Sequence, residues 1–240
     1  MKIIFKPTLD IAKDFPPIPC KKDIPEWYKD MSIYMNGIKL SAKDFVEGDH
    51  KTAYTVKKCV PVQDFLCTGY YLRMPSDLLI SNRFNNGRST IHYYTNGDEV
   101  PSWIHYHPHE QCPITIEDEN KLYLKFKFGY VIKTPPNYSC LFIQNPLNFD
   151  SKLKFFPAIV DTDTYDREIQ QTFYLTKGNY DIHLQSGDPM MMVIPFKRDD
   201  WKAIVEDKLY DDYTGNAYKV LRHYLKDGYR RFFHHKKNFD

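Results

Sequence analysis

The sequence predicts a mainly β protein, built as an antiparallel β-barrel or β-sandwich. From about residue 51 onward, short runs rich in Val, Ile, Thr, Tyr and Phe alternate with turn signals. The turns carry hairpin sequences, namely NNG at 85–87, TNGD at 95–98 and TKGN at 176–179. The strands expected from these runs span residues 52–60, 68–74, 77–84, 89–95, 121–132, 139–144, 170–176 and 190–196.

The segment LYLKFKF, residues 122–128, shows the β periodicity most clearly. Leu and Phe occupy every second position, and Tyr and Lys stand between them. Because successive side chains of a strand point to opposite faces, this alternation predicts one buried and one solvated face. The face expected to be buried holds Leu122, Leu124, Phe126 and Phe128, and the other holds Lys121, Tyr123, Lys125 and Lys127.

Length and composition favour a single domain. The chain has 240 residues, a length that all-β units reach as one domain, and its 42% hydrophobic and 16% aromatic residues can build a core. We expect an extended arm over residues 1–50, a β body over 51–200 and a helical C-terminal region over 201–240. The formal net charge of +2 is too small to attract a polyanion to the domain as a whole.

The N-terminal arm is expected to be extended, because prolines recur too closely for a long helix. They stand at positions 7, 16, 17, 19 and 25. Only residues 24–31, IPEWYKDM, are expected to form a short helical turn, whose first turn tolerates proline and suits Glu26. Trp27 and Tyr28 are expected to pin this arm to the body.

The C-terminal region is expected to hold two short helices and a basic tail. Apolar residues recur at three-to-four spacing in 200–213 and again in 216–225. The tail, residues 228–240, mixes Arg230, Arg231, Lys236 and Lys237 with phenylalanines. A segment that mixes basic and aromatic residues can bind nucleic acid through charge and stacking. The same composition is typical of a solvated chain end whose aromatic rings pack on the protein.

Cysteine usage and hydropathy indicate a reducing compartment and no membrane. The cysteines at 20, 59, 67, 112 and 140 are odd in number and form no C-x-x-C pair, which favours reduced, mostly buried thiols. The sequence contains no apolar run long enough to span a membrane and no secretory signal at its start.

The segment WIHYHPHEQCP concentrates metal-ligating side chains. In an extended chain His105, His107 and His109 share one face, so two or three of them can bind iron, zinc or manganese. The H-x-H pair resembles that of cupin oxygenases, which adds Glu110 and a distant histidine, His183, to the candidates. Pro108 disfavours a regular strand here, so a solvated or hydrogen-bonded cluster is the alternative.

A second candidate site is the acidic turn in PAIVDTDTYDREI, residues 157–169. Together with the later segment IHLQSGDPMMMVIPF, it resembles two motifs of the trimeric dUTPase and dCTP-deaminase superfamily. The resemblance implies a nucleotide site in which Asp161 orients the attacking water and Tyr165 stacks on the deoxyribose. Compared with the family, this chain has one extra residue between Asp161 and Tyr165. The family's phosphate motif and glycine-rich closing arm are absent from the sequence. If the turn is not a nucleotide site, its side chains are expected to hydrogen-bond to the backbone of the turn or to bind a hard cation.

Over a wider span, residues 24–201 resemble a family of uncharacterised proteins of tailed bacteriophages and some bacteria. The segments IPEWYKD, TVKKCVP, GYYLRMPSDL and GDPMMMVIPFKRDDW are among those that carry this resemblance. This resemblance implies that the protein is located in the cytoplasm of an infected or host bacterial cell, or in a virion. We therefore expect a binding or assembly protein with protein partners or self-association. A metal-dependent enzyme is the first alternative and a dUTPase relative the second.

Overall fold

The computed structural model describes residues 1–37, 54–85, 88–95, 103–107, 123–145, 151–207 and 228–240. The chain divides into two compact units. The first, called the body below, comprises residues 1–23 and 69–198. The second, called the terminal unit, comprises residues 24–68 and 199–240.

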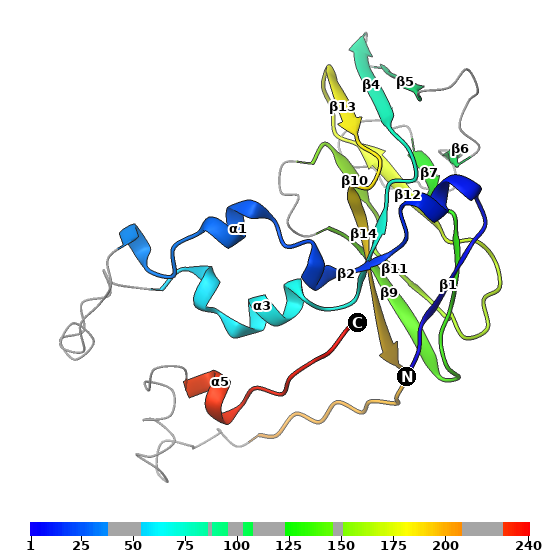
Figure 1. Ribbon diagram of the computed structural model, residues 1–240. Coiled ribbons are helices and arrows are strands. Elements are labelled where there is room, and N and C mark those ends of the chain that lie inside the picture. The colour runs from blue at the N-terminus through cyan, green and yellow to red at the C-terminus, as the bar shows by residue number, and fades with distance from the viewer. Residues whose placement is uncertain (38–53, 86–87, 96–102, 108–122, 146–150, 208–227) are drawn as a thin grey trace. The chain divides into compact units, whose positions relative to one another are not determined.

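The body is built from antiparallel strands in four sheets (Figure 1). The orders are β1-β8, β10-β12-β7-β6, β11-β9-β14-β3-β2 and β13-β4-β5. The strands are β1 (Ile4–Pro7), β2 (Ile18–Pro19), β3 (Tyr70–Arg73), β4 (Leu78–Asn85), β5 (Arg88–Tyr94), β6 (Ile104–His107), β7 (Tyr123–Lys127), β8 (Tyr130–Lys133), β9 (Tyr138–Gln144), β10 (Leu153–Phe155), β11 (Ala158–Val160), β12 (Gln170–Leu175), β13 (Tyr180–Leu184) and β14 (Pro189–Lys197). The expected mainly β, antiparallel class is confirmed, and the described strands form no closed barrel.

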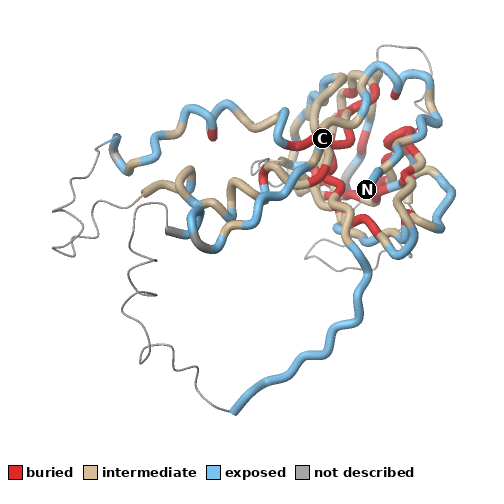
Figure 2. Tube along the Cα trace, turned by 60° about the horizontal axis from the view of Figure 1, so that its bottom comes forward, coloured by how far each residue is buried: buried red, intermediate tan, exposed pale blue. Residues whose placement is uncertain are grey.

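The sheets surround a large apolar core, most of whose buried residues lie in the strands of the body (Figure 2), and a second, small cluster holds Cys20, Tyr71 and Met192. The buried face expected in 122–128 is confirmed at Leu124, Phe126 and Phe128, which are fully buried, and Leu122 lies outside the described residues. The solvated face expected opposite is wrong at Tyr123, which is 1% exposed. The ring of Phe126 lies between 4.8 and 6.4 Å, centroid to centroid, from the rings of Trp103, Phe128, Phe155 and Phe173. Tyr123, on the opposite face, is buried as well because Phe156 and Tyr174 pack on its ring.

Strand β14 is the central strand of the five-stranded sheet. It pairs with β9 along Met191–Lys197 and with β3 through Met191, Met192 and Val193. Gly69 precedes β3 with φ +77°, and a Cβ there would stand 2.2 Å from the carbonyl oxygen of Val193. Only glycine fits this close approach of two backbones. The end of β14 positions Arg198, the last residue of the body.

The hairpin expected at NNG is confirmed by the register of β4 and β5. These strands pair from Leu79↔Tyr94 to Asn85↔Arg88, which leaves two residues for the connection. The strand β13 pairs on the other side of β4, with His183 opposite Leu79. Apolar residues of these strands point into the core, whereas His92, Tyr94, Asp181 and His183 are exposed.

Helices are short and few among the described residues. The expected turn at 24–31 is confirmed as α1 (Glu26–Asp30). The other helices are α3 (Val60–Leu66), α5 (Gly228–Phe232) and the 3-10 turns η1 (Asp10–Asp14), η2 (Cys20–Lys22), η3 (Met35–Gly37) and η5 (Val56–Lys58). None of the described helices is long and apolar enough to cross a membrane.

Three segments depart from the expected secondary structure. The single strand expected at 121–132 is wrong, because its described part forms two strands, β7 and β8, which belong to different sheets. The strand expected at 52–60 is wrong, because Val56–Lys58 is a 3-10 turn and α3 starts at Val60. Pro61 lies at the start of α3, where its missing N–H is not needed. The helix expected from residue 200 is also wrong over its described part, since residues 200–207 are neither helix nor strand. The helix expected at 216–225 lies outside the described residues.

Candidate functional site

The acidic turn connects β11 to β12 and is closed by its own backbone. The carbonyl oxygen of Asp161 accepts hydrogen bonds from the N–H of Thr164 at 3.1 Å and of Tyr165 at 2.8 Å. The hydroxyl of Thr164 donates to the same oxygen at 3.3 Å. Lys133, on β8, donates to the carbonyl oxygen of Tyr165 at 2.7 Å. The turn is therefore held both by itself and by a neighbouring sheet.

The carboxylates of the turn bind Arg198, which follows β14. Arg198 donates to both carboxylate oxygens of Asp163, with Nη1 to Oδ1 measuring 2.9 Å, and its Nη1 lies 3.1 Å from Oδ1 of Asp161. Ser139 donates to Asp161 at 2.6 Å, and the N–H of Asn137 donates to Asp163 at 2.9 Å. A bidentate pair, in which one guanidinium binds both oxygens of a carboxylate, is among the stronger ion-pair geometries. This group of five residues, the Arg198 network, links β9, the turn and the end of β14.

The Arg198 network sets the ionisation of its members. The hydrogen bond from Ser139, followed by that from Arg198, holds the pKa of Asp161 below its usual value. The guanidinium of Arg198 lowers the pKa of Asp163 in the same way. The side chain of Asp163 is 7% exposed and that of Asp161 62% exposed. Both carboxylates are thus anions with partners, and Asp163 is the more enclosed.

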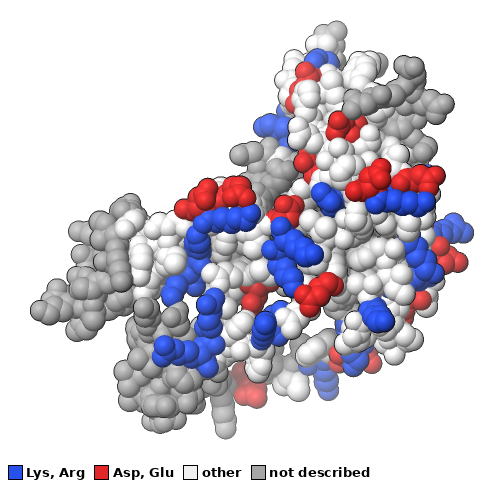
Figure 3. Space-filling model, in the orientation of Figure 1, with Lys and Arg blue, Asp and Glu red and all other residues white. Residues whose placement is uncertain are grey.

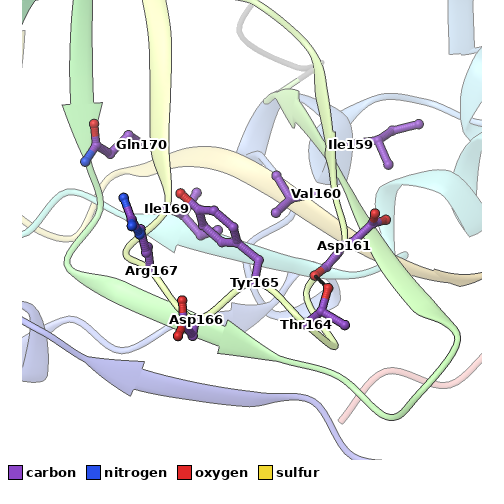
Figure 4. A pocket seen from close by; sticks show the side chains of 9 residues that line it. All are labelled: Ile159, Val160, Asp161, Thr164, Tyr165, Asp166, Arg167, Ile169 and Gln170. Atoms are coloured by element: carbon purple, nitrogen blue, oxygen red, sulfur yellow. Dashed lines mark hydrogen bonds between the residues drawn. The ribbon is translucent and has the colours of Figure 1, made fainter.

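The turn forms one wall of an open pocket of about 550 Å³. Tyr165 lies across the pocket, between Arg167 on one side and Asp161 and Val160 on the other (Figure 4). The ring of Tyr165 is 40% exposed, and Ile159 beside it on β11 is 64% exposed. Asp161 and Tyr165, the residues expected to form a nucleotide site, therefore line the same pocket. Arg167 is its one cation among the described lining residues.

The histidine candidates lie on two different sheets. His105 and His107 share one face of β6, opposite Lys125 and Tyr123 of β7. His183 lies on β13, in the three-stranded sheet. Burial, and then the nearby charge of Lys125, lower the pKa of His107 and favour its neutral, metal-binding form. His109 and Glu110 lie outside the described residues.

Among the side chains that the structure describes, no three of the types His, Cys, Asp and Glu group closely enough to hold a metal ion. The candidate ligands His105 and His107 lie close together, but the structure does not show a third ligand beside them. The metal assignment, with iron, zinc or manganese as the ion, therefore stays a prediction.

None of the four described cysteines forms a disulfide, and they differ in burial, with Cys67 half-buried. Cys20 and Cys140 are buried, as expected. Burial raises the pKa of Cys140 to about 11, so this thiol stays protonated. Cys59 is exposed, so the expectation of a buried thiol is wrong there. Cys112 lies outside the described residues.

Comparison with known proteins gives only a faint structural likeness. No protein-family model matches the chain, and no curated protein matches it in sequence. The dUTPase of Staphylococcus bacteriophage 80alpha, in a mutant form with dUpNHpp, aligns with a TM-score of 0.33 and 6% identity, covering 59% of this chain and 87% of that one. A second mutant of the same dUTPase aligns with a TM-score of 0.32 and 6% identity, covering 60% of this chain and 86% of that one. At these values the likeness assigns no function to the chain.

Sequence reasoning missed Ser139 and Arg198 as partners of the acidic turn. Each lies more than twenty positions from Asp161 along the chain, and neither belongs to a recognisable motif. The run KRDD at 197–200, two basic residues followed by two acidic ones, was the one available signal. The pairing itself follows from the register of β9 with β14.

Proposed function

We propose that this protein is a binding or assembly protein that self-associates through residues 199–207. This segment is distinct from the N-terminal arm and is called the arm below. One observation carries the proposal: Trp201, Ile204 and Val205 are 91, 77 and 91% exposed. Singly exposed apolar residues are common, but three large ones within five positions are not. The sequence resemblance to phage proteins suggests that this association takes place in an infected bacterial cell or in a virion.

Burial of the arm is the physical driving force for association. Moving a large apolar side chain from water into an apolar contact stabilises the complex by roughly 1.5–3 kcal/mol. The arm is extended, so it can lie along a partner without first unfolding a helix. Its apolar residues alternate with Lys202, Glu206 and other charged groups, which keep a free arm hydrated. A second copy is the partner proposed, and its edge strand β11 offers the exposed side chain of Ile159.

Light scattering over a range of protein concentrations tests this proposal. We expect an oligomer for the wild type and a monomer for Trp201→Ser combined with Ile204→Ser. A matched control, Ile4→Ser with Tyr94→Ser, removes side chains that are 51 and 56% exposed in the body, and should leave the oligomer intact. A monomeric wild type at every concentration would reject self-association through the arm.

Nucleotide binding is a second candidate function, favoured by the shared pocket of Asp161 and Tyr165. The exposed ring of Tyr165 can stack on a base or sugar, and Arg167 can bind a phosphate. Hydrolysis is not expected, because one arginine gives too little positive charge for a triphosphate. Incubation with deoxynucleoside triphosphates should release no phosphate or diphosphate. Turnover that Asp161→Asn abolishes would contradict this expectation and establish an enzyme.

A further inference from the structure

Within the basic tail, residues 228–240, the stretch 229–237 is fastened to α3. Asp64, on α3, accepts a hydrogen bond from Lys237 at 2.6 Å and lies 3.0 Å from Nε2 of His234. Arg230, on α5, donates to Oε1 of Gln63 at 2.9 Å. These contacts, all within the terminal unit, fix both ends of residues 229–237. The tail is therefore an ordered surface rather than a loose chain end.

The fastened tail carries both exposed aromatic rings and exposed cations. Tyr229 and Phe233 are 42 and 41% exposed, and their ring centroids lie 6.3 Å apart. Arg231 and Lys236 are exposed, and no carboxylate among the described residues pairs with either. Residues 228–239 contain no acidic residue. Lys and Arg side chains gather over the part of the surface that holds α3 and α5 (Figure 3).

A neighbouring turn adds to this basic surface. The side chain of Gln63 donates to the carbonyl oxygen of Lys57 while it accepts from Arg230. The 3-10 turn η5, which carries Lys57 and Lys58, therefore lies next to the start of the tail. Lys58 lies 5.5 Å from the ring centre of Tyr54. The basic and aromatic character thus extends beyond the tail itself.

We propose that residues 229–237 bind single-stranded nucleic acid, with Tyr229 and Phe233 stacking on bases and Arg231 and Lys236 contacting phosphates. Exposed rings between cations are the combination that single strands require, because each unpaired base offers a face for stacking. Duplex DNA hides those faces, and α5 has only five residues, too few to follow a major groove. A membrane surface would need a longer helix with a continuous apolar face.

Fluorescence anisotropy of a labelled oligothymidylate, titrated with the full chain at several salt concentrations, tests the proposal. We expect binding that weakens as salt rises, because released counterions drive it. Arg231→Ala combined with Lys236→Ala should lower the slope of log K against log salt by roughly 1.4, or about 0.7 for each lost phosphate contact. Phe233→Ala should weaken binding by roughly fivefold or more at constant slope.

A matched control and two competing ligands make the outcome decisive. Lys2→Ala with Lys6→Ala removes the same charge from the exposed side chains around β1, and should leave affinity and slope unchanged. Every variant is first compared with the wild type in circular dichroism and melting temperature. The proposal is overturned if the wild type does not bind at low salt, or if the control pair weakens binding equally. It is also overturned if duplex DNA or phosphatidylserine vesicles bind as tightly as the oligothymidylate and Phe233→Ala has no effect.

Discussion

The body and the terminal unit use their apolar residues in opposite ways. Nearly all of the fully buried apolar side chains belong to the body, and the terminal unit contributes only Tyr28 and Leu66 to them among the described residues. More than half of the large apolar side chains described in the terminal unit are instead exposed, from Phe65 at 38% to Trp201 at 91%. The described contacts that fasten its tail are polar, at Gln63 and Asp64.

The contrast separates a unit with a closed apolar core from a unit with exposed apolar surface. A closed apolar core supplies most of the folding free energy of a domain, whereas exposed polar and ionic contacts supply little. The body therefore has the means to fold by itself. The terminal unit keeps apolar surface available, and both proposals concern its exposed side chains. The tests below probe this division, from the largest expected effect to the smallest.

The largest effect is expected from Phe126→Ala, at the centre of the aromatic cluster. Phe126 is fully buried and has four aromatic neighbours, so its removal leaves a cavity. We expect the free energy of unfolding to fall by about 3–5 kcal/mol, measured by urea denaturation. Phe233→Ala, which truncates a ring that is 41% exposed in the terminal unit, should lower it by about 0.5 kcal/mol or less. Equal losses would contradict the division between the two units.

A smaller effect is expected in the Arg198 network. Asp161→Ala should lower the melting temperature by a few degrees, and Asp163→Ala by more, because it removes the acceptor of the N–H of Asn137 and the carboxylate that binds both terminal nitrogens of Arg198. Neither loss should depend on added calcium or magnesium. A cation-dependent rise in the melting temperature of the wild type, absent in Asp161→Ala, would show that the turn is a cation site.

The network also predicts the direction of an acid transition. Asp161 and Asp163 have lowered pKa values in the folded state. Their stabilising contribution is therefore complete above the unfolded pKa of about 3.9 and is lost as the pH falls through the lowered values. Melting temperatures measured between about pH 2 and 5 should fall less steeply in the double alanine variant than in the wild type.

A local effect is expected from Asp64→Asn, which removes the charge that fastens the tail. Hydrogen exchange should become faster in residues 229–237 and stay unchanged in β7 and β14. The hydrogen bond from Lys237 is the main cause of the lowered pKa of Asp64, so acid should release the tail as the pH falls through that value. Slow exchange of the tail in the variant would show that other contacts hold it.

The smallest effect is expected from His105→Ala combined with His107→Ala. We expect unchanged metal content in protein purified without chelator or affinity tag, and an unchanged melting temperature. The metal-enzyme alternative predicts the opposite, namely loss of most bound iron, zinc or manganese. In that case the wild type should bind metal more weakly at acidic pH, because protonated histidines do not bind metal. The lowered pKa of His107 would keep this imidazole neutral to a lower pH. Stoichiometric metal that the double variant loses would revive the enzyme alternative.

Local patterns in the sequence determined the class of the protein and the faces of its clearest strands. The alternation at Leu124 and Phe126 identified a buried face because the side-chain period of a strand is two residues. The NNG sequence identified the β4–β5 hairpin because Asn-Gly is typical of two-residue connections between antiparallel strands. The motif resemblance also identified Asp161 and Tyr165, which line one pocket. Each of these signals is contained within a few consecutive residues.

Only the tertiary structure decided what depends on distant contacts. The spacing of Trp201, Ile204 and Val205 predicted a helix, but a short helix needs a surface against which to pack, and the arm stays extended. The partners of Asp161 are set by the pairing of β9 with β14, which brings Ser139 and Arg198 to the turn from remote positions. A sequence pattern reports periodicity along the chain, whereas partners across space follow from strand register and packing.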